Sequence, residues 1–194
     1  MKTKRQRLVK IAETLALKPF HGNVMGLRSN IKPLTDHFPD GHRKEFEGKW
    51  CAAFVYHCCI QAGFKIPYRY PSKKFGAFAG VRAWLNWAKL RENQFYYSSQ
   101  NRNFSPQSGD IVIYDNIFDP GPHDHIGIIL AVDSHNLRVA EGNVNNFSMV
   151  ITRKRNSHVR GYIRIPDAYE HKPPKPGVKA RGNRHPQIPG AESA

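Results

Sequence analysis

The sequence predicts an α+β domain in which N-terminal helices pack on an antiparallel β-meander. Two observations carry this prediction. The first half of the chain holds segments whose apolar residues recur at helical spacing, and the part after Pro106 holds short β-rich runs separated by turn residues. Helices followed by consecutive strands are typical of the α+β class. With 194 residues, the chain fits one such domain with extensions, or two small domains at most.

The N-terminal segment is expected to form an amphipathic helix over residues 5–18. Its apolar residues that recur at helical spacing are Leu8, Ile11 and Leu15. The segment is basic like a signal peptide, but Lys10 and Glu13 interrupt its apolar part and no small-residue cleavage site follows. No run of the chain approaches the roughly 18 apolar residues that span a bilayer. We therefore expect neither a Sec signal nor a membrane anchor.

Two further helices are expected before Pro106. Residues 50–62 carry an apolar stripe and are followed by Gly63, a natural C-terminal cap, so they predict a helix. Residues 79–90 carry a second apolar stripe and predict another. The intervening residues 19–47 are rich in Gly, Pro, Asn, Asp and His, which indicates a loop with room for one short helix.

The second half of the chain predicts five strands and a tail. The β-rich runs are residues 109–115, 124–133, 137–143, 148–154 and 161–165. Residues 133–136 suit a hairpin turn between the second and third runs. Residues 166–194 are rich in Pro, Gly and basic side chains and predict a disordered tail. The expected organisation is an extension over residues 1–39, a domain over residues 40–165 and this tail.

All three cysteines lie in the stretch GKWCAAFVYHCCIQAG, which begins at Gly48. Cys51 stands where the predicted helix begins, without a Ser, Thr, Asp or Asn as cap, so unpaired backbone N–H groups and the helix dipole would stabilise a thiolate there. An inert buried cysteine is the alternative. Cys58 and Cys59 lie inside the same helix and are interpreted as core residues, since adjacent cysteines in a helix cannot pair without distortion.

A catalytic thiol needs a base, and the base needs an orienting group. His125 begins the most apolar strand, and alternation places it on the same face as Gly127, whose missing side chain would leave room for a substrate. The next strand ends in Glu141 and Asn143, which share a face, and either could hold the imidazole tautomer. The alternative is a solvent-facing strand histidine followed by ordinary turn residues.

A metal site competes for the same histidine. His123 and His125 would place two imidazoles on one strand face, as some zinc hydrolases do. The sequence holds no further histidine-rich cluster and no CxxC pair. Glu45 and Glu47 precede the cysteine but lack a calcium-loop pattern. We therefore expect no metal ion and no other cofactor.

The chain is strongly basic, with a formal net charge of +15. Such a charge predicts attraction to a polyanion, which includes nucleic acid, an anionic membrane and an anionic cell wall. The sequence shows no zinc finger, no aromatic-glycine RNA signature and no convincing helix-turn-helix. Nucleic acid is therefore not the expected partner.

Four motifs, WCAAFV, GDIVIYD, HIGIIL and EGN, occur in this order along the chain. In this respect the sequence resembles the CHAP amidohydrolase/peptidase family, within the wider NlpC-type papain-like cysteine peptidases, over about residues 40–165. The resemblance implies a papain-like fold, with Cys51 as nucleophile, His125 as base, and Glu141 and Asn143 as the pair that orients and polarises. It also implies bacterial peptidoglycan as the substrate, cleaved between muramic acid and L-alanine or within its peptides.

Further expectations concern the substrate site, the basic surface and the location of the protein. Trp50 and Gly127 are expected to contact substrate, and the backbone N–H of Cys51 is a candidate oxyanion donor. The basic surface and tail are expected to bind anionic cell-wall polymers. Without a Sec signal, action on the wall would follow another export route or phage-type release, and otherwise the protein would be cytoplasmic. A papain-like hydrolase of another amide, and a non-enzymatic basic protein that binds walls or nucleic acid, remain alternatives.

Overall fold

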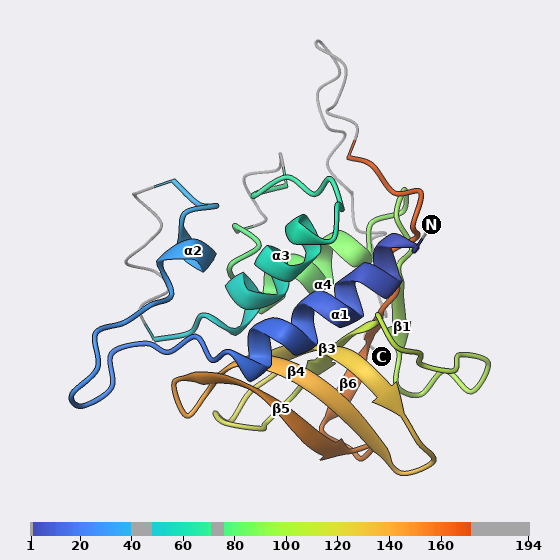
Figure 1. The fold of residues 1–194 in the computed structure, drawn as a ribbon. Helices are drawn as coiled ribbons and strands as arrows, with labels where there is room; N and C mark the ends of the chain where they lie inside the picture. Colours follow the sequence, from blue (N-terminus) through green and yellow to red (C-terminus); the bar gives the residue numbers. More distant parts are fainter. Residues whose placement is uncertain (1, 40–47, 71–75, 172–194) are drawn as a thin grey trace, which may run out of the picture.

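Helices cover one face of an antiparallel sheet in the computed structural model, which describes residues 2–39, 48–70 and 76–171 (Figure 1). The helices are α1 (Lys4–Leu17), α2 (Lys32–Thr35), α3 (Cys51–Gln61) and α4 (Val81–Ala88). The strands are β1 (Tyr96–Ser98), β2 (Ile111–Tyr114), β3 (His125–Val132), β4 (Asn136–Val144), β5 (Phe147–Lys154) and β6 (Val159–Ile163). The predicted α+β class is confirmed.

The sheet has the strand order β1-β6-β2-β3-β4-β5, and every neighbouring pair is antiparallel. Strands β2 to β5 form the predicted meander. Strand β6 leaves this pattern, because it returns to pair with β2 on the opposite side from β3. Short strand β1, which the sequence did not predict, then pairs with β6. The predicted hairpin turn is present, since Asp133 Oδ1 accepts hydrogen bonds from the backbone N–H groups of His135 and Asn136.

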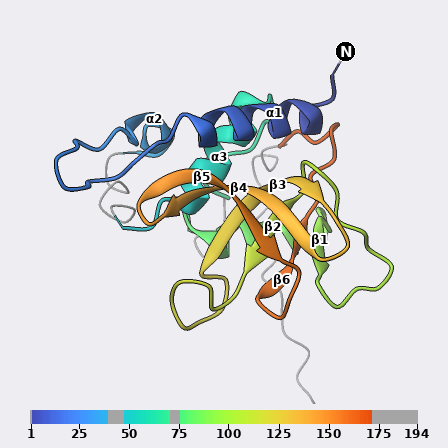
Figure 2. The same ribbon diagram turned by 60° about the horizontal axis from the view of Figure 1, so that its bottom comes forward.

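Helix α1 is part of the main core and does not form a separate extension. A capping box between Thr3 and Gln6 begins the helix, and its buried face consists of Leu8, Ala12 and Ala16. Figure 2 shows α1 and α3 together on one side of the sheet. The predicted boundary at residue 39 therefore does not separate two structural units.

The predicted boundary at residue 166 is too early. Asp167 accepts a hydrogen bond from the backbone N–H of Arg5 at 2.8 Å. The Tyr169 ring packs edge-on against Trp87 and Phe95, with centroid distances of 5.5 and 5.3 Å. Residues 166–171 therefore belong to the domain, and the remainder of the predicted tail lies outside the described residues.

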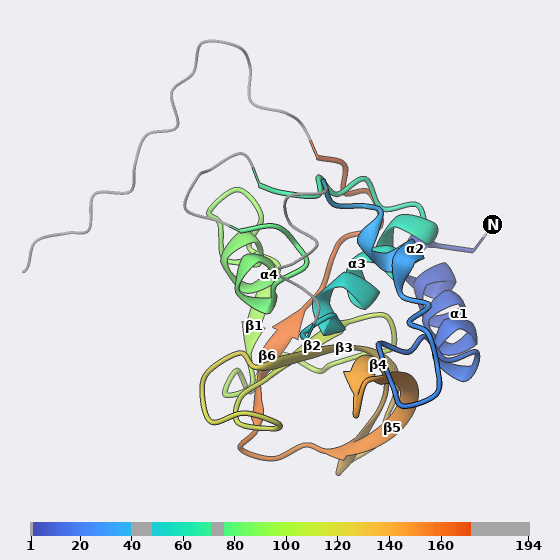
Figure 3. The same ribbon diagram turned by 90° about the vertical axis from the view of Figure 1, so that its left-hand side faces the viewer.

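Helix α3 is surrounded by other elements. It lies over β3 and β4 and beside α1 and α2, and α4 lies near the β1 end of the sheet (Figure 3). Consequently every residue from Cys51 to Cys59 is buried, where an apolar stripe had been predicted. Cys58 and Cys59 are fully buried core residues, as predicted. Gly63 adopts φ +91° just beyond the helix, a conformation that favours glycine and agrees with its predicted capping role.

No helix within the described ranges is long and apolar enough to cross a lipid bilayer.

Candidate active site

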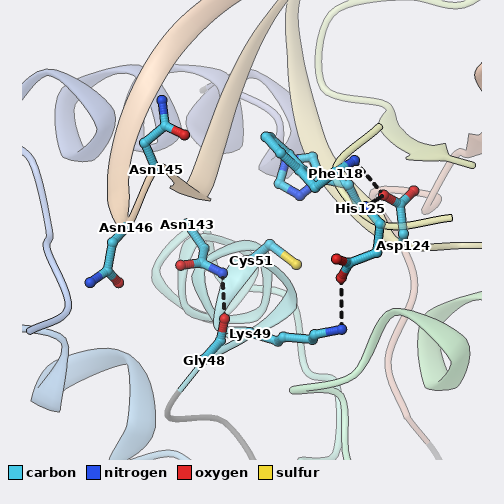
Figure 4. A pocket seen from close by; sticks show the side chains of 10 residues that line it. Gly48, Lys49, Cys51, Phe118, Asp124, His125, Asn143, Asn145 and Asn146 are labelled. Carbon is cyan, nitrogen blue, oxygen red and sulfur yellow. Dashed lines mark hydrogen bonds and ion pairs between the residues drawn. The ribbon is translucent and has the colours of Figure 1, made fainter. Parts of the chain in front are cut away.

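Cys51 is the first residue of α3, at the edge of a cavity of about 350 Å³. The residue before it, Trp50, provides no side-chain cap. The backbone N–H groups of the first helical turn and the positive end of the helix dipole therefore remain available to a negative charge near the sulfur. Figure 4 shows the Cys51 sulfur just below the His125 ring.

His125 and Glu141 meet because β3 and β4 run antiparallel, which places the start of β3 beside the end of β4. Glu141 lies opposite Gly127 in the register, so its side chain is on the same face as His125. The His125 Nε2 atom and the Glu141 Oε2 atom are 2.8 Å apart. Both side chains are almost completely buried, with 2% and 0% exposed. The other ring nitrogen, Nδ1, is then the one available to Cys51.

The environment of His125 favours its protonated form. Burial alone would lower the pKa of the imidazole, but hydrogen bonding to Cys51 and Glu141, and their negative charges, outweigh it and raise this pKa to about 9. The histidine is therefore an imidazolium at neutral pH, placed between two groups that can each carry a negative charge.

Arg153 on β5 is the second partner of Glu141, and the sequence analysis missed it. Its Nε and Nη2 atoms donate to Glu141 Oε1 and Oε2, each at 2.6 Å. Despite complete burial, the pKa of Glu141 is lowered by its hydrogen bonds with Arg153 and His125. An arginine twelve residues further along the chain offers no local sequence signal, because the contact depends on how β4 and β5 pair.

Gly127 does not leave room for a substrate. A Cβ atom at this position would lie 2.5 Å from Val139 Cγ1 and 2.8 Å from Glu141 Cγ. The missing side chain therefore makes space for Glu141, and Gly127 does not line the cavity.

Asn143 lies at the cavity but does not contact His125. It adopts φ +64° and donates from Nδ2 to the carbonyl oxygen of Gly48 at 2.9 Å. Of the two residues predicted to orient the imidazole, the one that contacts it is Glu141. Asn143 instead ties the end of β4 to the loop that precedes Cys51.

Trp50 lies beneath the site and not at the substrate surface. Its side chain is fully buried, and its Nε1 atom donates to Asn146 Oδ1 at 3.2 Å. The bulky ring packs against the backbone at Gly142, where a Cβ atom would lie 2.9 Å from it. Trp50 therefore supports the start of α3 from below, which corrects the prediction that it contacts substrate.

His123 belongs to a different cluster from His125. Its φ of +46° turns the chain, and its backbone N–H donates to Asp115 Oδ1. Burial and the nearby Arg160 lower the pKa of His123, whereas the pKa of His125 is raised. Within the described residues, no group of three or more His, Cys, Asp or Glu side chains could hold a metal ion. Glu45 and Glu47 lie outside the described residues.

Charged residues that the sequence analysis did not single out form the rim of the cavity. Lys49 donates to Asp119 Oδ2 at 2.8 Å, and this exposed ion pair joins the loop before Cys51 to the β2–β3 loop. Asp124 Oδ2 accepts three backbone N–H groups from residues 117–119 and so shapes that loop. The remaining lining residues are Gly48, Phe118, Asn143, Asn145 and Asn146.

A cysteine at a helix N-terminus, a histidine on the adjoining sheet and a buried carboxylate behind it are the arrangement of a thiol hydrolase. Comparison with protein families agrees, since the CHAP domain model matches residues 43–143, just over half of the chain, including Cys51, His125, Glu141 and Asn143. The chain belongs to the CHAP family, which consists of cysteine/histidine-dependent amidohydrolases and peptidases.

Among solved structures, "The crystal structure of Ly7917" is similar to 86% of this chain, with 16% sequence identity and a TM-score of 0.48. The chain covers 63% of that structure's own length. Comparison with curated proteins gave no match.

Proposed function

We propose that this protein hydrolyses amide bonds of bacterial peptidoglycan, with Cys51 as nucleophile, His125 as general base and acid, and Glu141 as the group that orients His125. The observation that carries the proposal is the buried contact between His125 Nε2 and Glu141 Oε2 at 2.8 Å, with His125 and Cys51 lining the same cavity. This order of groups is what a thiol nucleophile requires.

The reaction would be acyl transfer in two steps. In the resting pair, the proton of the Cys51 thiol resides on His125, and the thiolate attacks the amide carbonyl carbon to form a tetrahedral intermediate. His125 then gives its proton to the leaving amine, and a thioester remains on Cys51. In the second step His125 takes a proton from water, the hydroxide attacks the thioester, and the carboxylic acid leaves as the thiol is restored.

The start of α3 would stabilise the oxyanion of each tetrahedral intermediate. The backbone N–H of Cys51 is the proposed donor, because it lies at the open end of the helix. Asn143 would act indirectly, through its hydrogen bond to Gly48, by holding the loop that leads to this N–H group. Peptide substrates suit the cavity, whose rim combines charged side chains with asparagine amides.

The proposed substrate is either the bond between muramic acid and L-alanine or a bond within the stem or cross-bridge peptides. The experiment is digestion of purified cell walls, with mass spectrometry of the released fragments. A new N-terminal L-alanine would identify an amidase, and other new peptide amines would identify an endopeptidase. Fragments without either change, together with hydrolysis of another amide, would favour a papain-like hydrolase with a different substrate.

Cys51→Ala and Cys58→Ala provide a matched pair of variants for this experiment. Both remove a buried thiol from α3, but only Cys51 lines the cavity. Cys51→Ala is expected to abolish hydrolysis, and Cys58→Ala is expected to retain it in the folded protein. Hydrolysis that survives in Cys51→Ala would overturn the assignment of the nucleophile.

We also propose that basic residues concentrate the enzyme at anionic wall polymers. The formal net charge is +15, and residues 172–194 contribute five Lys and Arg side chains against one Glu. The test compares lysis rates against salt concentration for the full chain and for a chain that ends at His171, which keeps the packed Tyr169. Steeper loss with salt for the full chain supports the proposal, and identical curves contradict it.

A further inference from the structure

We propose that Arg153 is a positioning residue of the active site, which fixes Glu141 against His125 and balances the charge of the thiolate form. The inference rests on the proposed function, and it adds Arg153 to Cys51, His125 and Glu141. Arg153 does not touch the cavity around Cys51, so it would act only through its neighbours.

The ion pair between Arg153 and Glu141 has the geometry of a rigid clamp. Two parallel N–H···O hydrogen bonds of 2.6 Å join the guanidinium to both carboxylate oxygens. The carboxylate is completely buried and the Arg153 side chain is 15% exposed. Two-point contact prevents the carboxylate from rotating, so Oε2 remains directed at the His125 ring.

Aromatic rings hold the guanidinium and the imidazole in the same packed unit. The guanidinium carbon of Arg153 lies 5.5 Å from the Tyr114 ring centroid and 5.3 Å from that of Phe118. These two rings also contact His125, with centroid distances of 6.2 Å for Tyr114 and 4.7 Å for Phe118. A shift of Arg153 would therefore disturb the walls around the imidazole as well as its carboxylate partner.

The second part of the role concerns charge. The titratable and charged groups that face this unit come from the loop before α3, α3, β2, the β2–β3 loop, β3, β4 and β5: Lys49, Cys51, Tyr114, Asp124, His125, Glu141 and Arg153, of which Lys49 is exposed and paired with Asp119. In the reactive form, the Cys51 thiolate and Glu141 are negative, while His125 and Arg153 are positive. These four buried or half-buried charges sum to zero.

Without Arg153 the same form would carry one uncompensated negative charge in a site of low polarity. Burying such a charge is costly. Without Arg153, the form of the site with no net charge is the one in which the Cys51 thiol is protonated beside the His125 imidazolium and the Glu141 carboxylate. Loss of the arginine should therefore shift thiolate formation to higher pH. Loss of the arginine should also raise the pKa of His125 further, because the Glu141 carboxylate would then interact with the imidazole alone.

The first experiment measures Cys51 directly, without any substrate. The rate of Cys51 alkylation is followed against pH for the wild type, Arg153→Met and Arg153→Lys. We expect the midpoint for Arg153→Met to rise by about one pH unit or more, as removal of a nearby charge does. Arg153→Lys keeps the positive charge, so its alkylation midpoint should shift less. An unchanged midpoint in Arg153→Met would overturn the charge-balancing role, whatever the substrate of the enzyme proves to be.

Arg164→Met is the matched control. Arg164 also makes a two-point ion pair with a completely buried carboxylate, Asp110, but this pair does not contact His125. The control should lower the melting temperature without moving the alkylation midpoint. Equal midpoint shifts in both variants would show a general effect of stability and would contradict the proposal.

The second experiment measures hydrolysis. Loss of an outer partner that orients a histidine costs about 10–100-fold in activity in metal sites, and a similar loss is expected here, so kcat of Arg153→Met should fall by about that factor with KM nearly unchanged. Both limbs of its pH–rate profile should move to higher pH. An unchanged kcat and pH profile would overturn the positioning role. Absence of wall hydrolysis in the wild type, together with a shifted alkylation midpoint, would contradict only the proposed substrate.

Chemical rescue separates the guanidinium itself from general packing. A second cavity of about 300 Å³, lined in part by Arg153, Lys154 and His158, adjoins the arginine and offers a route for small molecules. Methylguanidinium at millimolar concentration should therefore restore part of the lost kcat to Arg153→Ala, and methylammonium should restore less. Equal effects of the two cations, or no rescue, would contradict the two-point clamp.

Discussion

Gly127→Ala tests whether Glu141 needs the space that the missing side chain of Gly127 leaves free. The added Cβ atom would lie 2.5 Å from Val139 Cγ1, 2.8 Å from Glu141 Cγ and 3.1 Å from the carbonyl oxygen of Ala140. Contacts below 3.0 Å force the Val139 and Glu141 side chains to move, and the backbone carbonyl of Ala140 at 3.1 Å leaves the added atom little room to shift away from them. Overpacking of a core costs about 1–3 kcal/mol, which lowers the melting temperature of a chain of this size by about 2–4 °C per kcal/mol.

The activity of Gly127→Ala should fall by more than its loss of folded protein accounts for. Glu141 Cγ is one of the two side-chain atoms that must move, and the Glu141 carboxylate is bound to both His125 and Arg153. A misplacement of about 1 Å in a catalytic group can cost about 100-fold in rate, so we expect kcat to fall by about 10–100-fold at temperatures where the variant is folded. Thermal denaturation and the rate of wall hydrolysis, or of a model amide, measure the two effects.

Gly80→Ala is the control for this variant. At Gly80 the nearest atom to an added Cβ is the carbonyl oxygen of Ala77 at 3.7 Å, an ordinary contact. Gly80 is the N-cap residue of α4, where alanine is less favourable than glycine, so the melting temperature should fall slightly while kcat stays close to the wild type. If Gly127→Ala lost stability but kept its full kcat, the idea that Gly127 makes room for a correctly placed Glu141 would be refuted.

Three other predictions follow from buried ionisable groups. Activity should decline above about pH 9 as His125 loses its proton. Because the folded-state pKa of His125 lies above the usual 6.5, the charged imidazolium stabilises the fold by about 3 kcal/mol below pH 6.5, and this stabilisation disappears as the pH rises through 9. The difference in melting temperature between wild type and His125→Gln should therefore shrink over that range. Iodoacetamide followed by peptide mass spectrometry should modify Cys51 first, since burial raises the pKa of Cys58 and Cys59, and earlier labelling of either would contradict the assignment. Asp110→Asn should destabilise the fold by about 3 kcal/mol in urea denaturation, because two arginines lose their carboxylate partner. The folded fraction of this variant should keep its activity. A loss of stability below about 1 kcal/mol would show that the ion pairs contribute little.

Local patterns in the sequence were sufficient for several parts of the site. The absence of a capping side chain before Cys51 indicated an open helix N-terminus, and the structure places the cysteine there. The apolar run after His125 indicated a strand, which begins at that histidine. These signals are reliable because helix ends, strand alternation and turns depend on residues that are close together in the chain.

Contacts between strands were less accessible from the sequence. Glu141 and Asn143 lie on the same strand two residues apart, so alternation alone could not decide between them. The positive φ of Asn143 and its hydrogen bond to Gly48 turn it away from the imidazole. Arg153 gave no signal at all, since its contact with Glu141 depends on the pairing of β4 with β5 and on the reach of a long side chain.

The sequence by itself determined the α+β class, the helix that presents Cys51, the strand that begins at His125 and the family to which the chain belongs. Only the tertiary structure decided that α1 and residues 166–171 complete the core. It also decided that Trp50 and Gly127 lie inside the protein next to the site, and that Arg153 forms an ion pair with the carboxylate that contacts His125. The reason is physical: periodicity and caps are properties of neighbouring residues, whereas burial, strand pairing and the direction of long side chains depend on how the whole chain packs.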